Sequence, residues 1–199
     1  MTHARDTGLY DSTLDKSSCG VGFITRKDGV QTHDVLTLGH DALCVVPHRG
    51  GMSAEGVGDG AGVNVDLSVA FFSAITGKSL EAGNFGVGNF FLPTDAAAHP
   101  AAEELVSSAL ARAGVTVLAV RDVPVEDDAL RPTALKYQLP IRQWVFSRPA
   151  SCATVEDFDR LLYDVLLEVE ARAYTEPELA GLYPLSLSAR TQVLKNRLN

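Results

Sequence analysis

The sequence is poor in cysteine and in basic residues, and it contains no long apolar run. Its three cysteines are an odd number at wide spacing, which argues against the disulfide framework of a small secreted protein. The 17 scattered Lys and Arg face 25 Asp and Glu, for a net charge of −8, so a broad contact with nucleic acid is not expected. No segment approaches the roughly 18 apolar residues of a membrane-spanning helix. These absences favour a cytoplasmic protein with neither nucleic acid nor membrane as partner.

The composition that remains is that of one globular domain. The 199 residues are 46% hydrophobic and 21% charged, far from the composition of disordered chains. A chain of this length buries about 70% of the surface that its unfolded form exposes. It therefore needs neither a disulfide nor a metal ion to be stable.

Hydrophobic periodicity predicts a mixture of helices and strands from residue 19 onward, which is an α+β fold. Thr154 is a candidate N-cap for the clearest helix, with acidic residues in its first turn. We expect helices at about 34–46, 96–113 and 154–174. We expect strands in the segments CGVGFITRK, GVNVD, GNFGVGNFFLP, VTVLAVRDVPV, RQWVFSRP and, as one last strand, LYPLSLSARTQVLK.

Cys19 is the most informative residue, because it stands where the polar segment 1–18 gives way to a small-residue, β-rich run. If residues 1–18 are removed, Cys19 carries a free α-amino group with a pKa of about 8, a usable base beside its own thiol. One residue would then supply both the nucleophile and the base. The alternative is a small buried core cysteine, and this residue alone does not decide between the two.

Several segments, taken together, resemble one family. In chain order they are GLYD at 8–11, CGVGF at 19–23, HRG at 48–50, GDGAG at 58–62, FF at 71–72, RDVP at 121–124 and SLSART at 186–191. This series resembles the N-terminal amidotransferase domain of the glutamate synthase large subunit, a class II glutamine amidotransferase of the N-terminal-nucleophile hydrolase superfamily. The resemblance spans nearly the whole chain and implies an αββα sandwich.

The resemblance also implies roles for individual residues. Residues 1–18 would be a propeptide and 19–199 the domain, with Cys19 attacking the side-chain amide of glutamine and forming a thioester as ammonia leaves. Arg49 would support the pocket beside this nucleophile. Four further residues would lie close to the substrate: Gly50, Gly58, Asp59 and Gly60. In the family, ammonia then reaches an FMN-bearing domain that has no counterpart here, so we expect no cofactor in this chain.

The sequence departs from the family pattern in one respect. It contains no Asn-Gly dipeptide, so the histidine-asparagine-glycine motif that builds the oxyanion hole is absent, as is the strand whose arginine grips the substrate carboxylate. Loss of a single oxyanion donor typically lowers the rate ~100- to 1000-fold. We therefore expect these 199 residues to hold part of an active site and an incomplete sandwich.

Three explanations of this departure stay open. The chain is one piece of a split amidotransferase completed by a second polypeptide, a catalytically silent homologue that acts as a binding or assembly subunit, or a truncated product. The first predicts an exposed apolar surface at which the partner docks.

A metal site is a weaker alternative. His40, Cys44 and His48 are spaced by four residues and would share one face of an unbroken helix, as zinc ligands can. Pro47 disturbs that helix, and His48 already belongs to the HRG segment. Ordinary helix residues explain this spacing better, and we predict no metal.

Overall fold

The fold is that of a computed structural model, which describes residues 20–45, 60–130 and 132–196. Its helices are α1 (His33–Cys44), α2 (Val69–Thr76), α3 (His99–Arg112), α4 (Pro132–Leu135) and α5 (Val155–Thr175). Its strands are β1 (Ala61–Asp66), β2 (Phe85–Phe91), β3 (Thr116–Asp122), β4 (Ile141–Ser147), β5 (Tyr183–Ser188) and β6 (Thr191–Asn196).

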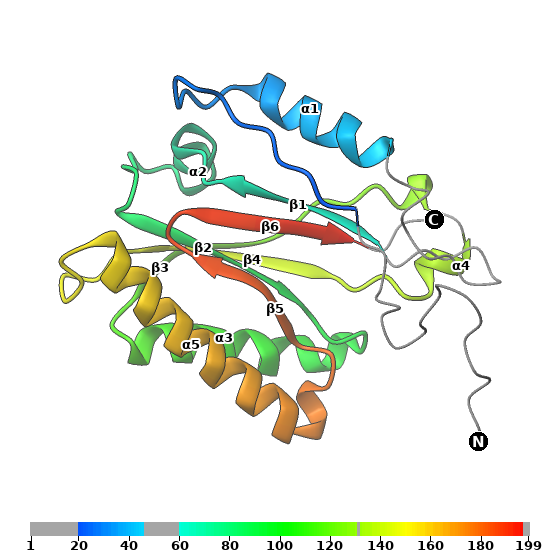
Figure 1. The fold of residues 1–199 in the computed structure, drawn as a ribbon. Coiled ribbons are helices and arrows are strands. Elements are labelled where there is room, and N and C mark those ends of the chain that lie inside the picture. The colour runs from blue at the N-terminus through cyan, green and yellow to red at the C-terminus, as the bar shows by residue number, and fades with distance from the viewer. Residues whose placement is uncertain (1–19, 46–59, 131, 197–199) are drawn as a thin grey trace, which may run out of the picture.

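The strands form two antiparallel sheets. The main sheet has the order β3-β4-β2-β5, and β1 pairs with β6 in a second sheet of two strands. Figure 1 shows α3 and α5 on one side of the main sheet, and β1, β6 and then α1 on the other. The order of layers is α, β, β, α, which confirms the predicted sandwich.

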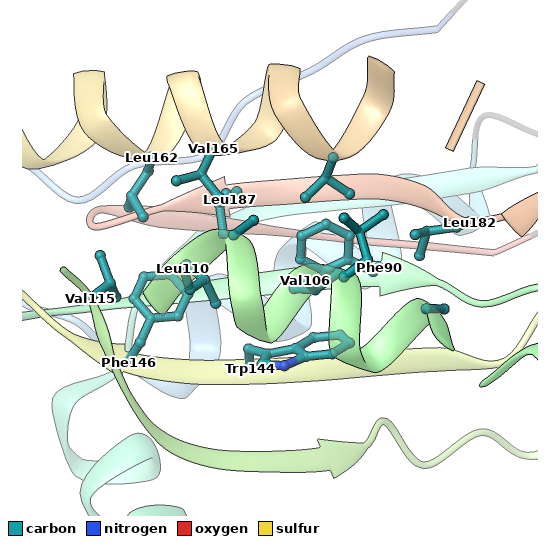
Figure 2. Close-up of a cluster of buried hydrophobic side chains, with 14 of the residues drawn as sticks. Phe90, Val106, Leu110, Val115, Trp144, Phe146, Leu162, Val165, Leu182 and Leu187 are labelled. Atoms are coloured by element: carbon teal, nitrogen blue, oxygen red, sulfur yellow. The ribbon is translucent and has the colours of Figure 1, made fainter. Parts of the chain in front are cut away.

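The larger core fills the space between the main sheet and helices α3 and α5. Phe90, Trp144, Phe146 and Leu187 project from the strands and meet apolar side chains of both helices (Figure 2). The phenyl ring of Phe146 packs edge-on against Phe158 of α5, with centroids 6.1 Å apart. The buried indole N–H of Trp144 donates to Ser107 Oγ of α3 at 3.2 Å, so no polar atom of that ring is left unsatisfied.

The opposite face of the main sheet carries a smaller apolar cluster. Successive side chains of a strand point to opposite faces, so Phe85, Val87 and Val145 point away from α3 and α5. They pack with Leu67 and with Phe72 of α2. The main sheet is therefore buried on both faces.

The sequence-based predictions agree with the structure for the helices and for four of the strands. The helix predicted at 34–46 is α1, which ends at Cys44, and those predicted at 96–113 and 154–174 are α3 and α5. A 3₁₀ turn at Ala96–Ala98 accounts for the earlier predicted start of α3. Thr154 caps α5 as predicted, since its hydroxyl accepts the N–H of Asp157, whose carboxylate accepts the N–H of Thr154.

Two predictions of strands were wrong. The single last strand is a pair, β5 and β6, because the chain bends at Ala189 and Arg190 and enters the second sheet. The segment that begins CGVGF forms no strand between Gly20 and Lys27, where the structure describes it. Val21 and Phe23 are 94% and 91% exposed. An alternating apolar pattern makes a strand only where another strand supplies its hydrogen bonds.

We predict that Gly86→Ala destabilises the protein by about 1–3 kcal/mol, because it overpacks the larger core. A Cβ at this position of β2 would lie 2.5 Å from Cε2 of Phe146 and 3.1 Å from the carbonyl oxygen of Ser188. Urea unfolding measures the loss. The matched control is Gly22→Ala, which meets nothing within 4 Å. Equal urea midpoints for the two variants would show that β2 does not pack as described.

Candidate functional site

Of the residues predicted for the site, the structure describes Gly60. Cys19, Arg49, Gly50, Gly58 and Asp59 lie outside the described residues. Gly60 directly precedes β1, and its φ of +95° is a conformation that side chains with a Cβ rarely adopt. Ala61, the first residue of β1, pairs with Asn196, the last of β6. The GDGAG segment thus enters the second sheet at the end where β6 finishes.

A second glycine of this segment explains how closely the two strands approach. A Cβ on Gly62 would lie 2.9 Å from the carbonyl oxygen of Leu194 and 3.1 Å from Cβ of Lys195. Backbone geometry alone therefore explains why positions 60 and 62 are glycine, without any contact with substrate. The predicted contact of Gly60 with substrate stays a prediction.

The chain that follows the predicted nucleophile reaches the core through a few polar contacts. A turn closes at Gly29, whose N–H donates to the carbonyl of Arg26 at 3.2 Å. Gln31 Nε2 then donates to the carbonyl of Leu67 at 3.2 Å, beyond the end of β1. The helix α1 lies over β1, yet none of its residues is buried. This part of the described chain is therefore the least covered by packing.

The SLSART segment forms the corner at which the chain passes from the main sheet to the second one. Ser188 Oγ and the N–H of Ala189 donate to one carboxylate oxygen of Asp159, at 3.1 and 2.8 Å. Arg190 forms ion pairs with Glu156 and Asp159 of α5, and its carbonyl accepts the N–H of Leu67 at 2.9 Å. We call Glu156, Asp159, Ser188, Ala189 and Arg190 the corner. Its residues hold the fold together at the point where β5, β6, α5 and β1 meet.

A pocket of about 520 Å³ lies beside this corner. Gln31, Asp66, Phe85, Glu156 and Arg190 are among its lining residues. It lies at the Asp66 end of β1, whereas Gly60 lies at the other end of that strand, about 20 Å away for six residues of extended chain. The pocket is therefore separate from the only predicted site residue that the structure describes.

The sequence predicted no role for Glu156 or Asp159, and Ser188, Ala189 and Arg190 were noted only as part of the SLSART segment. Asp159 and Ser188 are 29 residues apart, and Glu156 and Arg190 are 34 apart. Their pairing depends on how α5 packs on β5, which periodicity does not specify. The signal that was available is the N-cap at Thr154, since it places Glu156 in the first turn of the helix.

The described residues contain no cluster that suits a metal ion. No group of three or more His, Cys, Asp or Glu side chains comes together among them. Cys44 Sγ lies 4.0 Å from the ring nitrogens of His40, as residues four apart on a helix do, and His48 lies outside the described residues. None of the helices in the described ranges is long and apolar enough to cross a bilayer.

Comparison with known proteins identifies the family. The model of the family "Glutamine amidotransferases class-II" matches residues 19–199. The chain belongs to the class II glutamine amidotransferases. The match begins at Cys19, the residue predicted as the nucleophile.

The relatives of this amidotransferase domain include several glutamate synthases. It is 32% identical over 195 residues to ferredoxin-dependent glutamate synthase 2 of Arabidopsis thaliana and 31% identical over 195 residues to the large chain of glutamate synthase [NADPH] of Bacillus subtilis. It is 34% identical over 187 residues to ferredoxin-dependent glutamate synthase 2 of Synechocystis. These alignments cover 91–96% of the chain but only 12–13% of the relatives. The chain is thus a glutamate synthase-like amidotransferase domain.

We predict that Glu156 of the corner and the neighbouring Asp157, which caps α5, make stability fall in acid. A hydrogen bond from its own backbone N–H and the guanidinium of Arg190 hold the pKa of Glu156 below its ordinary value. Hydrogen bonds from Thr154 lower the pKa of Asp157. Both carboxylates are therefore more acidic in the folded protein, so their stabilisation is present above pH ~4 and is lost as the pH falls through the folded pKa values.

The measurement is the urea midpoint of the protein and of the double variant Glu156→Gln/Asp157→Asn between pH 6 and pH 3. We expect the double variant to lose less stability over this range than the unaltered chain does. Glu104→Gln, on α3 and away from the corner, is the matched control. The prediction is wrong if the double variant and the unaltered chain lose stability in parallel.

Proposed function

We propose that this domain hydrolyses the side-chain amide of glutamine and releases ammonia, with Cys19 as the nucleophile. The observation that carries the proposal is the family match, which begins at Cys19 and runs through residue 199. It is supported by the αββα order of layers, with the polar segment 1–18 preceding the cysteine in the sequence. Residues 1–18 are then a propeptide, and their removal frees the α-amino group of Cys19.

In this mechanism the thiol sulfur of Cys19 bonds to the amide carbon of glutamine while the α-amino group takes the thiol proton. The carbon–nitrogen bond then breaks, and the leaving nitrogen receives that proton and departs as ammonia. The thioester that remains is cleaved by water, which yields glutamate and restores the thiol. Dividing amide hydrolysis into these two stages lowers the barrier of each.

We assign supporting roles to the other predicted residues. Arg49 supports the pocket beside the nucleophile. Gly50, Gly58 and Gly60 bring backbone close to the substrate, because a glycine leaves the space that a side chain would fill. Asp59 stands between Gly58 and Gly60 in the same substrate-binding segment. The position of Gly60 before β1, with a positive φ, suits such a close approach.

We further propose that a second polypeptide segment completes the site and passes the ammonia on to an FMN-bearing synthase domain. Two observations support completion. Val21 and Phe23, just after the nucleophile, are almost fully exposed. The helix α1 buries none of its side chains, although it carries Leu36 and Leu38 and is followed directly by Val45, which is also exposed. Exposed apolar surface of this kind marks a site of interaction. This chain itself holds no cofactor in the proposal.

The first test of the role of Cys19 is the mass of the purified protein, which shows whether residues 1–18 have been removed. In protein purified from its native host, we expect a mass that corresponds to a chain beginning at Cys19, and glutaminase activity that Cys19→Ala abolishes. Cys19→Ser, which keeps a hydroxyl in place of the thiol, should retain only a small fraction of the rate. A chain that still begins at Met1 in active protein would rule out the free amine as base. Equal rates for Cys19→Ala and the unaltered chain would rule out the nucleophile.

Completion is tested by adding a second polypeptide that carries the histidine-asparagine-glycine motif missing from these 199 residues. We expect the glutaminase rate to rise by roughly 100- to 1000-fold, which is what one oxyanion donor contributes. The complex with Cys19→Ala is the control, and it should show no such rise. A full rate for the isolated chain would contradict the need for a partner.

A silent binding or assembly subunit is the second candidate, and the same exposed apolar residues favour it. The two candidates differ in one outcome. If the complex forms but hydrolyses glutamine no faster with Cys19 than with Cys19→Ala, the chain acts by binding alone.

A further inference from the structure

Three amide side chains are buried between the two sheets. Asn89 of β2, Gln143 of β4 and Gln192 of β6 are 0%, 1% and 7% exposed. They are the buried polar residues among those that the structure describes. Asn89 and Gln143 lie on the face of the main sheet that points toward β6, and Gln192 lies on β6 itself. We call Asn89, Gln143 and Gln192 the amide network.

Hydrogen bonds join the amide network into one unit. Gln143 Nε2 donates to Asn89 Oδ1 at 2.8 Å and to Gln192 Oε1 at 3.1 Å. Asn89 Nδ2 donates to the backbone carbonyl of Val193 at 3.0 Å and, more weakly, to Gln192 Oε1 at 3.4 Å. At the outer end, Arg121 Nε donates to Gln143 Oε1 at 2.8 Å, and the guanidinium lies 5.5 Å from the ring centre of Phe71.

The hydrogen bonds of the amide network connect the main sheet to the second sheet. The bond from Gln143 to Asn89 lies within the main sheet, whereas those to Gln192 and Val193 cross to β6 in the second sheet. The other half of the same face, with Phe85, Val87 and Val145, is apolar. Apolar contacts alone would let a two-stranded sheet slide, whereas hydrogen bonds with fixed donors and acceptors favour one position.

We infer that Asn89, Gln143 and Gln192 are positioning residues that fix the register of β6 on the main sheet and, through β1, the place of Gly60 and Gly62 of the GDGAG segment. The link from β6 to β1 is a ladder of six residue pairs, from Asp66 with Thr191 to Ala61 with Asn196. Gln192 is four residues from Asn196, about 13 Å along an extended strand. The part of this inference that concerns the GDGAG segment rests on the proposed function, and the part that concerns register does not.

The test of register is hydrogen exchange followed by mass spectrometry on the full chain. Gln192→Met removes both bonds to Gln192 Oε1 and keeps the length of the side chain. We expect peptides that cover β1 and β6 to exchange about tenfold faster relative to peptides that cover β2 and β4, the size of effect that one or two hydrogen bonds produce.

A triple variant separates register from stability. Asn89→Leu/Gln143→Met/Gln192→Met leaves no amide of the network buried without a partner. Arg121 Nε and the carbonyl of Val193 each lose a partner, but both bonds are only partly buried, so the urea midpoint should stay near that of the unaltered chain. Exchange in β1 and β6 should nevertheless stay fast. The control is Val87→Ala, on the same face of β2, which lowers the urea midpoint by opening a cavity but leaves the ratio of exchange between the two sheets unchanged. An unchanged ratio in both Gln192→Met and the triple variant overturns the inference.

The second readout is glutaminase kinetics in the completed complex. If the amide network positions the GDGAG segment, Gln192→Met raises KM for glutamine more than it lowers kcat, and Gln192→Glu, which keeps the accepting oxygen, restores part of the loss. Faster exchange with unchanged KM would overturn the link to the GDGAG segment and leave the register role standing. Absence of activity in the unaltered complex would contradict the proposed function but not the result from exchange.

Discussion

The structure depends on the two different faces of β2, the strand between β4 and β5 in the main sheet. Toward α3 and α5, Gly86 and Gly88 leave room for the ring of Phe146 and the side chain of Leu187. Toward the second sheet, Phe85 and Val87 give an apolar half and Asn89 a polar one. A four-layer sandwich needs a sheet that is buried on both sides, and this alternation meets that need within seven residues. The helices and the second sheet can pack only because β2 presents a different surface to each.

Two of the motifs behind the family resemblance, RDVP and SLSART, serve structural purposes in the part of the chain that the structure describes. In RDVP, Arg121 ends the amide network and Asp122 forms an ion pair with Arg142. In SLSART, Ser186 accepts the N–H of Val193, and Ser188 and Arg190 build the corner. A chain that must leave one sheet and enter another exposes backbone groups at the bend, and those groups need partners. Side chains of the motif and of Asp159 supply them, which is a physical reason for such a motif outside the catalytic centre.

Features that depend on residues close together in the sequence could be predicted, whereas features that depend on contacts between distant residues could not. Helix α5 was predictable because its cap, Thr154 with Asp157, and its apolar stripe are local. The bend at Ala189 and Arg190 was not, because periodicity continues across it and only contacts with α5 reveal it. The amide network joins residues 54 and 103 positions apart, and no local pattern marks Asn89 or Gln192 as buried. For the site, the resemblance identified the family, while the placement of Cys19 and Arg49 is outside the described residues. In the segment after Cys19 the sequence pattern predicted a strand that does not form. Its alternation is typical of a strand, but no described strand pairs with it.

Packing is distributed unevenly between the scaffold and the part that carries the predicted chemistry. The larger core, between the main sheet and α3 and α5, contains most of the fully buried side chains, including Trp144, Phe146 and Phe158. The segment after Cys19 and helix α1 contribute none. Since stability follows buried apolar surface, the main sheet and its two helices can remain folded while residues 20–45 rearrange. A partner that covers Val21, Phe23 and α1 would then add order where the reaction is proposed to occur. The scaffold would need little change on binding, because its own core is already closed.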